Sequence, residues 1–367
     1  MKINRLKLSH FRLYNSLDLT CHPHINIIIG DNAQGKTSVL ESIHILGITK
    51  SHKTLKDIEV IQTHSDFAKI QGMLSFEKTS VELDIVISKN GKKAKYNRIE
   101  IDRLSDYIGY LNIVMFSPED IDLIKGSPIE RRRFMDLELG KLKKSYLQHV
   151  NHYRRILKER NEVLKGLQQN QKYNHTILEV LTEQLIHYGQ KIVEAREAFI
   201  KDLNQRVSTM YYKISGESLN SRIVYNPSVH ENFKQAYTKR QRQDIQFGTT
   251  HLGPHRDDFS IMMEEALFKN YASQGQIRSM VLAIKLSMVD LIHKEKKVYP
   301  VVLLDDVFSE LDKDRQLNLL KHLNQETQLF ITTTDISNIP IEELSSHQII
   351  EISKGKIKGV TENATKL

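Results

Sequence analysis

Apolar and polar positions alternate near the start of the chain in the manner of β-strands. Three segments carry this strand pattern: INRLKLSHF (3–11), SLDLT (16–20) and INIII (25–29). The third is apolar throughout, which is typical of a strand buried on both faces at the centre of an α/β sheet. The next segment, 36–48, has apolar residues at helical spacing, namely Val39, Leu40, Ile43 and Leu46. The pattern therefore predicts a buried strand, a turn and a helix in succession.

Strand patterns return twice further along the chain. Residues 68–101 contain AKIQGMLSF, SVELDIVIS and KYNRIEI, with a turn through Asn90-Gly91. From residue 300 onward the segments YPVVLLDD, QLFITTTD and HQIIEIS also predict strands. Both ends of the chain are thus expected to contribute to one α/β domain.

Between these regions the spacing becomes helical. From about Glu130, apolar or aromatic residues recur every three or four positions: Leu142, Tyr146, Val150, Tyr153, Leu157 and Leu164, then Ile177, Leu181, Leu185, Tyr188, Ile192, Phe199 and Leu203. A Gln/Asn-rich break at 166–174 separates the two sets. We expect two long paired helices, each about 45–50 Å at 1.5 Å per residue, that project as a hairpin because their other faces are polar.

The simplest organisation is an α/β head with a helical arm inserted into it. We expect residues 1–128 and 250–367 to form the head, and residues 129–249 the arm.

The 53 Lys and Arg exceed the 45 Asp and Glu, a net charge of +8, which favours a polyanionic partner such as nucleic acid or a membrane surface. Cys21 is the single cysteine, so an internal disulfide and a four-cysteine zinc site are excluded. No apolar run approaches the roughly 20 residues of a membrane span, and residues 1–11 lack the apolar core of a secretory signal, so we expect a cytoplasmic protein.

A phosphate-binding loop lies between the predicted buried strand and helix. GDNAQGKT spells G-x-x-x-x-G-K-T, and we predict that all eight residues line the site: Gly30, Asp31, Asn32, Ala33, Gln34, Gly35, Lys36 and Thr37. The two glycines let backbone amides wrap the phosphates, and the helix N-terminus adds partial positive charge. Lys36 supplies a cation for the outer phosphates, while the Thr37 hydroxyl can ligate Mg²⁺. We therefore expect ATP and Mg²⁺ as cofactors.

VVLLDD, residues 301–306, is a buried strand that ends in two carboxylates. Alone it would be read as a strand entering an acidic surface turn. Paired with the phosphate loop, it predicts that Asp305 holds Mg²⁺ and that Asp306 orients or deprotonates the attacking water.

A second small-residue turn, SQGQ, precedes another helical pattern. Ser273, Gly275 and Gln276 match the S-x-G-Q core of the ABC-type ATPase signature, and SELD at 309–312 follows the acidic strand as a D-loop does. With HFRLYNSLDL, FSPEDIDLIKGSPIERRRFMD, HLGPHRDDF and ITTTD, the whole chain resembles the RecF family, recombination-mediator ATPases related to SMC-type heads.

The resemblance implies an ABC/SMC-like P-loop ATPase head with an inserted helical arm. In such heads the signature turn faces the nucleotide of a second copy, so Ser273 and the amides near Gly275 would make an ATP-dependent homodimer. The family likeness also implies DNA repair with RecO and RecR, RecA loading at stalled forks and gaps, and support of the SOS response. Asp306 in place of Glu, and Thr333 or Thr334 in place of a switch histidine, favour a weak, slow ATPase stimulated by DNA.

Two groups of basic residues are candidates for DNA contact. Arg131, Arg132 and Arg133 begin a stretch, 129–165, with eleven Lys and Arg against five Asp and Glu; the alternative is a solvated helix face or internal ion pairing. Lys53 is a further candidate, on the position of its loop in related heads. Tyr146 and Tyr153 are expected to pack within the hairpin rather than stack on bases.

The stretch HLGPHRDD has no generic mechanism. His255 with Asp257 and Asp258 is a poor metal-ligand set, and the family likeness makes Arg256 a candidate for structural or interface work.

Three other classes of ATPase or GTPase fit less well. A transporter ATPase subunit would lack the long insertion and would usually carry the switch histidine. An SMC-like structural DNA tether needs coiled coils of hundreds of residues. A guanine-specific switch protein needs an N-K-x-D segment after a strand, which this sequence lacks.

Overall fold

The computed structural model describes residues 1–76, 79–169, 175–230, 232–323, 326–344 and 346–363. They form two compact units. The first comprises Met1–Asp120, Thr209–Ser218 and Ser279–Leu367, and the second comprises Ile121–Ser208 and Leu219–Arg278. These boundaries differ from the head and arm expected above, since 121–128 and 250–278 group with the second unit and 209–218 groups with the first. One reason is that a strand at 258–263 pairs with a strand at 221–226 along its full length.

An antiparallel sheet of the first unit follows the predicted hairpin pattern, except that the segment 95–101, predicted as one strand, forms two strands joined by a turn at Asn97 and Arg98. Its order is β2-β1-β4-β5-β6-β7, with the bounds β1 (Lys2–Phe11), β2 (Tyr14–Thr20), β4 (Phe67–Phe76), β5 (Thr79–Ser88), β6 (Gly91–Tyr96) and β7 (Ile99–Ile101). Gly91 has φ +118 beside the β5–β6 turn, in agreement with the turn predicted at Asn90-Gly91. Alternate side chains, such as Leu6 and Leu8, are buried beneath this sheet.

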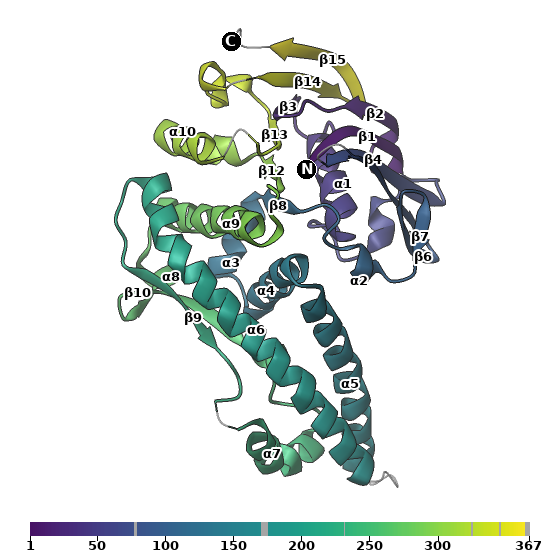
Figure 1. The fold of residues 1–367 in the computed structure, drawn as a ribbon, viewed down its shortest axis with the longest axis vertical. Coiled ribbons are helices and arrows are strands. Elements are labelled where there is room, and N and C mark those ends of the chain that lie inside the picture. Colours follow the sequence, from purple (N-terminus) through teal and green to yellow (C-terminus); the bar gives the residue numbers. More distant parts are fainter. Residues whose placement is uncertain (77–78, 170–174, 231, 324–325, 345, 364–367) are drawn as a thin grey trace. The chain divides into compact units, whose positions relative to one another are not determined.

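The other sheet of this unit is mainly parallel. Its order is β15-β14-β3-β13-β12-β8, with only β15 antiparallel, and the bounds are β3 (Ile25–Ile29), β8 (Ile113–Phe116), β12 (Val301–Asp305), β13 (Leu329–Thr333), β14 (His347–Ser353) and β15 (Lys356–Asn363). Helix α1 (Lys36–Ile48) contacts strands of both sheets, as Figure 1 illustrates. A helix covered on both sides is apolar around most of its circumference, which explains why Leu40, Ile43, Ile45 and Leu46 are all buried.

Shorter helices and two longer ones complete the first unit. They are η1 (Asp57–Val60), α2 (Leu104–Tyr107), η2 (Pro118–Ile121), η4 (Val307–Glu310), α10 (Lys313–His322), η5 (Ile336–Asn338), η6 (Ile341–Glu343) and, from Ser279 onward, α9 (Gln274–Lys296).

The second unit contains the predicted paired helices and more. Its elements are α3 (Asp122–Lys125), α4 (Pro128–Leu142), α5 (Lys144–Gln168), α6 (His175–Ser215) up to Ser208, β9 (Ser221–Asn226), α7 (Phe233–Phe247), η3 (Pro254–Arg256), β10 (Asp258–Met263), β11 (Ala266–Leu267) and α8 (Phe268–Tyr271). The last residues of α6, from Thr209 onward, group with the first unit. Helix α6 has 41 residues, about 60 Å at 1.5 Å per residue, and is longer than expected. Helix α5 has 25 residues and is shorter. Residues 170–174 of the expected break lie outside the described residues.

The sheet β11-β10-β9 and helix α7 were not predicted. Tyr146 and Tyr153 are buried, as predicted, at 1% and 2% exposure. None of the helices within the described parts of the chain is both long and apolar enough to cross a membrane.

Candidate functional site

The candidate site lies where the parallel strands of the first unit end. Strand β3 runs into the loop 30–35, β12 ends at Asp305, and its neighbour β13 ends at Thr333. Because parallel strands place their carboxyl ends at one edge of the sheet, these segments meet there, and this edge is the usual ligand site of open α/β sheets.

The phosphate loop is held in a tight, glycine-dependent conformation. Gly35 has φ +110, and a Cβ at this position would lie 2.8 Å from the hydroxyl oxygen of Tyr14. Tyr14 donates a hydrogen bond to the carbonyl oxygen of Gly35 at 3.0 Å. At the other end of the loop, a Cβ on Gly30 would lie 2.3 Å from the carbonyl oxygen of Ile352. Neither glycine can be replaced without moving the loop.

Lys36 directs its ammonium across this loop. Its Nζ donates to the carbonyl oxygens of Gly30 at 2.6 Å and of Asp31 at 2.8 Å. Burial lowers the pKa of Lys36, while the nearby charges of Asp306 and Asp305 act in the opposite direction. A cation is thus held at the mouth of an amide-lined loop, the arrangement that binds phosphate groups.

Thr37 joins the loop to the acidic strand. Its hydroxyl donates to Oδ1 of Asp305 at 2.8 Å, and Thr332 donates to the same oxygen at 2.8 Å. Asp305 is 4% exposed, and burial raises the pKa of its carboxyl group. Hydroxyl and carboxylate oxygens are hard donors of the kind that Mg²⁺ prefers.

Asp306 offers a further oxygen at this edge. Its backbone N–H donates to the Thr332 hydroxyl at 3.0 Å, and its φ of +56 turns the chain away from the strand. Its Oδ1 is buried and has no hydrogen-bond partner among the described residues. An unused buried acceptor next to Asp305 fits a site for water or a hydrated cation. No group of three or more His, Cys, Asp and Glu side chains among the described residues could hold a metal alone. Mg²⁺ sites commonly complete their coordination with substrate phosphates and water.

Lys53, expected to contact DNA, is directed into this site. Its Nζ lies 3.9 Å from Oδ2 of Asp305. Ser51 holds its loop: the Ser51 hydroxyl donates to Glu41 at 2.5 Å and accepts from the backbone N–H of Lys53 at 2.9 Å. Glu41 is 1% exposed and pairs through both oxygens with Arg12. Sequence reasoning missed Glu41, although a carboxylate four residues after Thr37 in an apolar helix was a usable signal.

Thr332 contacts the acidic pair, whereas Thr333, one of the two threonines predicted at the switch-histidine position, does not. Thr333 instead bonds within its own turn, donating to the carbonyl oxygen of Asp335 at 2.8 Å. Its hydroxyl also accepts from the Asp335 backbone N–H at 3.2 Å.

The SQGQ turn belongs to the second unit and caps helix α9. The Ser273 N–H donates to the Gln276 side chain at 3.0 Å, and the Gln276 N–H donates to the Ser273 hydroxyl at 3.2 Å. This reciprocal pair is a capping box. Ser273 is exposed and Gly275 is half-buried, so the start of the helix is open to solvent. Capping accounts for Ser273 and Gln276 locally and leaves the turn accessible to another molecule.

The three arginines of the basic stretch have different environments. Arg131 forms a bidentate ion pair with Asp258, at 2.7 and 3.0 Å, and also donates to the carbonyl oxygen of Gly126. Arg132 donates to the carbonyl oxygen of Asp257 at 2.8 Å. The guanidinium of Arg131 is committed to a structural pair, which corrects the prediction that it contacts DNA. Arg132 is half-buried and Arg133 is exposed, and for these two DNA contact stays a prediction.

HLGPHRDD is explained by a buried network in the second unit. Arg196, which is 3% exposed, donates to four partners there: Pro254 O at 2.7 Å, Asp136 Oδ1 at 2.9 Å, Tyr146 Oη at 3.0 Å and Asp257 Oδ2 at 3.2 Å. Asp257 also accepts a short hydrogen bond from Tyr225, and the His255 ring bonds to Tyr153 at 2.7 Å. The stretch thus ties the η3 turn to α5 and α6. Arg256 stays exposed.

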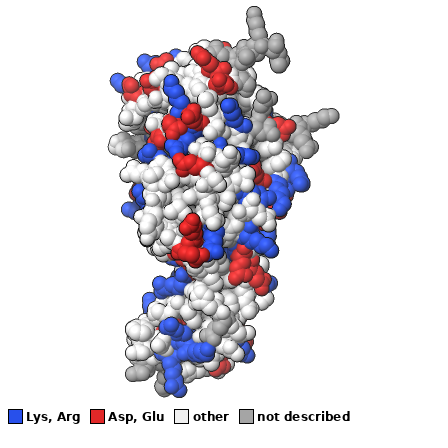
Figure 2. All heavy atoms as spheres, turned by 90° about the vertical axis from the view of Figure 1, so that its left-hand side faces the viewer, with Lys and Arg blue, Asp and Glu red and all other residues white. Residues whose placement is uncertain are grey.

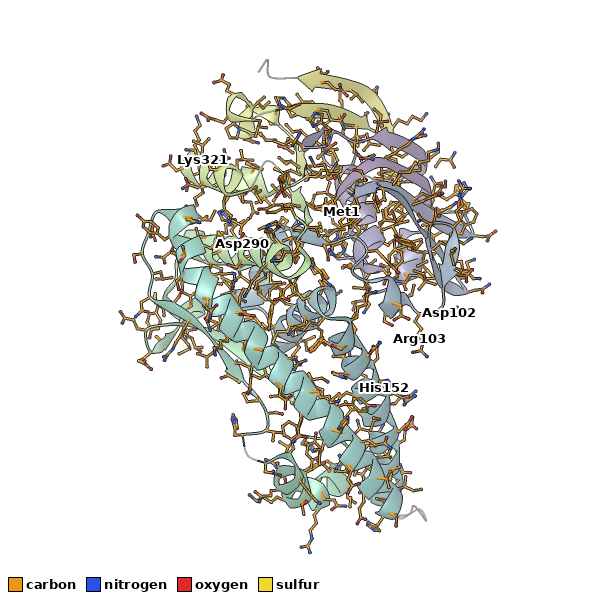
Figure 3. The ribbon with its side chains drawn as sticks, viewed as in Figure 1. Met1, Asp102, Arg103, His152, Asp290 and Lys321 are labelled. Atoms are coloured by element: carbon orange, nitrogen blue, oxygen red, sulfur yellow. The ribbon has the colours of Figure 1, made fainter. Side chains whose placement is uncertain are left out.

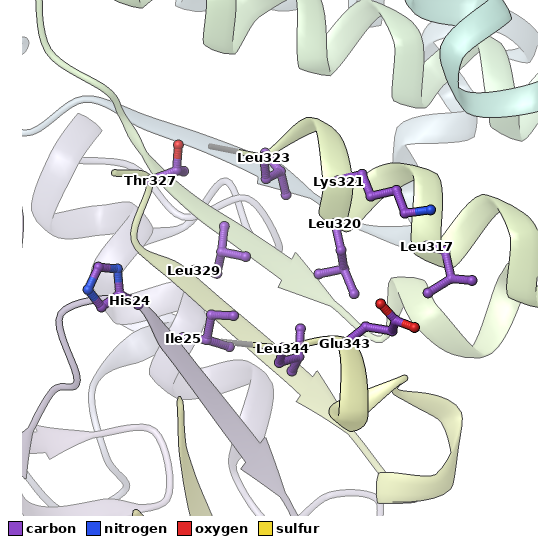
Figure 4. Close-up of a pocket in the computed structure, with 10 residues that line it drawn as sticks. All are labelled: His24, Ile25, Leu317, Leu320, Lys321, Leu323, Thr327, Leu329, Glu343 and Leu344. Carbon is purple, nitrogen blue, oxygen red and sulfur yellow. The ribbon is translucent and has the colours of Figure 1, made fainter. Parts of the chain in front are cut away.

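Other surface features are less distinctive. Acidic and basic side chains are interspersed on the face drawn in Figure 2. His152, labelled on α5 in Figure 3, stacks on Tyr188 with ring centroids 5.0 Å apart. A pocket of about 340 Å³ (Figure 4) lies at the opposite, amino-terminal edge of the parallel sheet, where β3 begins at Ile25 and β13 begins at Leu329. It is therefore distinct from the phosphate loop.

Comparisons with known proteins agree with this geometry. Residues 2–354 match the family model described as the RecF/RecN/SMC N terminal domain. The chain is 41% identical to the DNA replication and repair protein RecF of Staphylococcus carnosus (strain TM300), over 97% of this chain and 100% of that protein. It is 40% identical to RecF of Staphylococcus aureus (strain JH9), with the same coverage.

Solved structures give the same result. The recombination mediator protein RecF with ATP, in the RecFOR pathway, superposes with a TM-score of 0.89 at 30% identity, covering 99% of this chain and 98% of that one. An Smc head bound to the C-winged helix domain of ScpA has a TM-score of 0.56 at 15% identity, covers 99% of this chain and 98% of that one, and shares the fold.

Proposed function

Because this chain belongs to the RecF family of DNA replication and repair proteins, we propose that it is an ATP-controlled recombination mediator that pairs on ATP and binds DNA. The observation that carries the proposal is the hydrogen bond between Thr37 and Asp305, which brings the phosphate loop and the acidic strand into one site. A structure of a relative that superposes over nearly the whole chain is described as bound to ATP.

Each residue of the site has a distinct role in this proposal. The amides of 30–37 and the Lys36 ammonium bind the phosphates. Thr37 and Asp305 would hold Mg²⁺, which neutralises charge on the outer phosphates when it is bound. Asp306 uses its unpartnered oxygen to orient the attacking water and to accept its proton. The water oxygen bonds to the γ-phosphorus while the bond from that phosphorus to the β,γ-bridging oxygen breaks, and ADP leaves. Lys53 adds a second cation beside Asp305. We expect hydrolysis to be slow and to time the separation of the two copies as ADP and phosphate form.

Pairing follows from the exposed start of helix α9. A helix N-terminus attracts anions, and the Ser273 hydroxyl adds a donor. In a closed pair, Ser273 and the amides near Gly275 of one copy contact the outer phosphate held by Lys36 and its loop in the other. ATP then stabilises the pair because it binds both copies. Loss of the γ-phosphate removes that contact.

DNA is the expected polyanionic partner of a chain with net charge +8. Arg133, exposed on α4, is a retained contact candidate of the basic stretch. We propose that the protein acts in the cytoplasm at gaps and stalled forks. There it would work with RecO and RecR to load RecA and so support the SOS response, in keeping with the RecFOR pathway named for the structural relative.

Light scattering and fluorescence anisotropy test this function together. Molar mass is measured with and without ATP and Mg²⁺, and binding to a gapped duplex is measured over a range of salt. We expect the mass to double with ATP, and DNA affinity to rise with ATP and to fall with salt. A mass that stays at 42.6 kDa with saturating ATP, or DNA binding indifferent to ATP, would contradict the proposal.

A further inference from the structure

The turn between β14 and β15 lies against the phosphate loop. Lys354 and Gly355 form this two-residue turn, with φ of +48 and +68, between the paired residues Ser353 and Lys356. Positive φ at both central residues is the type I′ pattern of tight hairpins. Such a conformation is unfavourable for a lysine and persists only where the surrounding structure holds it.

The backbone N–H groups of both turn residues donate hydrogen bonds to one residue of the phosphate loop, Gln34. The N–H of Lys354 donates to the side-chain Oε1 of Gln34 at 2.6 Å. The N–H of Gly355 donates to the main-chain oxygen of Gln34 at 3.1 Å. The hairpin also reaches the first residue of the loop, because a Cβ on Gly30 would lie 2.3 Å from the carbonyl oxygen of Ile352 in β14. The end of the chain thus contacts the loop at two points.

These hydrogen bonds determine the direction of a peptide plane. In a planar trans peptide the carbonyl oxygen and the following N–H point in opposite directions. Since the Gln34 carbonyl points outward to Gly355, the Gly35 N–H points to the other side, into the concave face of the loop. The peptide plane between Gly35 and Lys36 is restrained in the same way, because the Tyr14 hydroxyl donates a hydrogen bond to the carbonyl oxygen of Gly35. Amides that converge on the concave face are what phosphate binding requires.

We propose that the β14–β15 turn, through Gln34, is a positioning element for the phosphate loop, fixing the Gly35 amide toward the α- and β-phosphates of the nucleotide. This inference rests on the proposed binding of ATP by residues 30–37. Gln34 acts through the loop backbone and is a positioning residue rather than a catalytic one.

Two substitutions disrupt the contact between Gln34 and the β14–β15 turn, one in the phosphate loop and one in the turn. Gln34→Met keeps the length of the side chain and removes its acceptor. Gly355→Ala places a Cβ 2.7 Å from the carbonyl oxygen of Leu13 at a φ of +68, and so displaces the amide donor. Each has a matched control in the same unit. Gln71→Met makes the same exchange on β4, and Gly91→Ala adds a Cβ at φ +118 that meets no atom within 4 Å.

Binding of a fluorescent ATP analogue and its displacement by inorganic pyrophosphate are measured, with thermal unfolding recorded in parallel. Pyrophosphate reports on the phosphate loop without the base. We expect Gln34→Met and Gly355→Ala each to lower the affinity for both ligands about tenfold, which corresponds to about 1.4 kcal/mol. The affinities of both control variants should stay within twofold of those of the natural protein.

Equal ATP affinity in Gln34→Met and the natural protein would overturn the inference. Loss of ATP binding with unchanged pyrophosphate binding would also overturn it, because the defect would then lie at the base. If Gln34→Met fails to fold, Gln34→Asn, which withdraws the acceptor by one methylene, takes its place. If the natural protein itself fails to bind ATP, the proposed function fails instead.

Discussion

Arg131 and Arg133 lie two residues apart on helix α4, and the structure gives them opposite roles. Arg131 is held by Asp258 and Gly126, and the side chains of Arg131 and Asp258 are 10% and 25% exposed. Arg133 is exposed. Arg→Met at each position keeps an unbranched side chain and removes the charge. The pair therefore separates a structural cation from a surface cation within one helix.

The expected cost of Arg131→Met follows from what it leaves behind. Removing one partner of a buried ion pair costs about 3–5 kcal/mol, and the partial exposure of Asp258 places this case near about 3 kcal/mol. For a unit the size of residues 121–208 with 219–278, each kcal/mol corresponds to about 2–4 °C, so the second unit should unfold about 6–12 °C lower. Arg133→Met should change the unfolding free energy by less than about 0.5 kcal/mol.

Thermal unfolding by circular dichroism and DNA binding by anisotropy over a salt range measure both effects. Below its unfolding temperature, Arg131→Met should bind DNA like the natural protein. Arg133→Met should bind DNA of every sequence more weakly. The slope of the logarithm of the DNA-binding constant against the logarithm of the salt concentration should be smaller in magnitude by about 0.9, as expected for one lost phosphate contact. A stable Arg131→Met protein with a reduced salt slope would refute the structural reading of this ion pair.

Three further predictions concern nucleotide chemistry and pH. Lys36→Ala should weaken ATP binding at least tenfold, measured by calorimetry, because it removes the cation from the loop; unchanged affinity would contradict its role. Asp306→Asn should retain ATP-driven pairing and lose phosphate release in a turnover assay, whereas undiminished turnover would exclude Asp306 as the base. Burial lowers the pKa of His255 to about 4, below the 6.5 of an unfolded chain, so the unfolded state binds the proton first. Stability of the second unit should therefore fall as pH drops from about 6.5 to about 4, and His255→Gln should flatten this fall; parallel pH curves would count against it.

Local patterns in the sequence predicted most of the strands of the first unit and the helix after the phosphate loop. A stretch of about a dozen residues is enough to recognise each of β3, α1 and β12, because each shows an apolar run or helical spacing next to a turn. The edge where they meet follows from the rule for parallel strands, so Thr37 and Asp305 could be placed together before any coordinates. β8 was missed because four apolar residues give too short a run to separate a strand from a buried loop.

Long-range pairings were not predictable in this way. Arg131 and its partner Asp258 are 127 positions apart, and nothing near Arg131 distinguishes it from Arg133. The same limit applies to Lys53, whose direction depends on Ser51 and Glu41. In the sheet of β9, β10 and β11, β9 and β10 pair across the intervening helix α7, and β11 has only two residues, so neither pairing was visible in the local pattern.

The central claim, that a nucleotide held by one copy joins it to another, is tested most directly by mixing two defective variants. Lys36→Ala disables the phosphate loop and Ser273→Arg disables the signature turn. Neither variant by itself should therefore form a pair when ATP is added. A mixed pair contains one intact site, made from the loop of the Ser273→Arg copy and the turn of the Lys36→Ala copy. Light scattering of the mixture with ATP and Mg²⁺ should show a species of twice the monomer mass, and a mixture that stays monomeric while the natural protein pairs would contradict the claim.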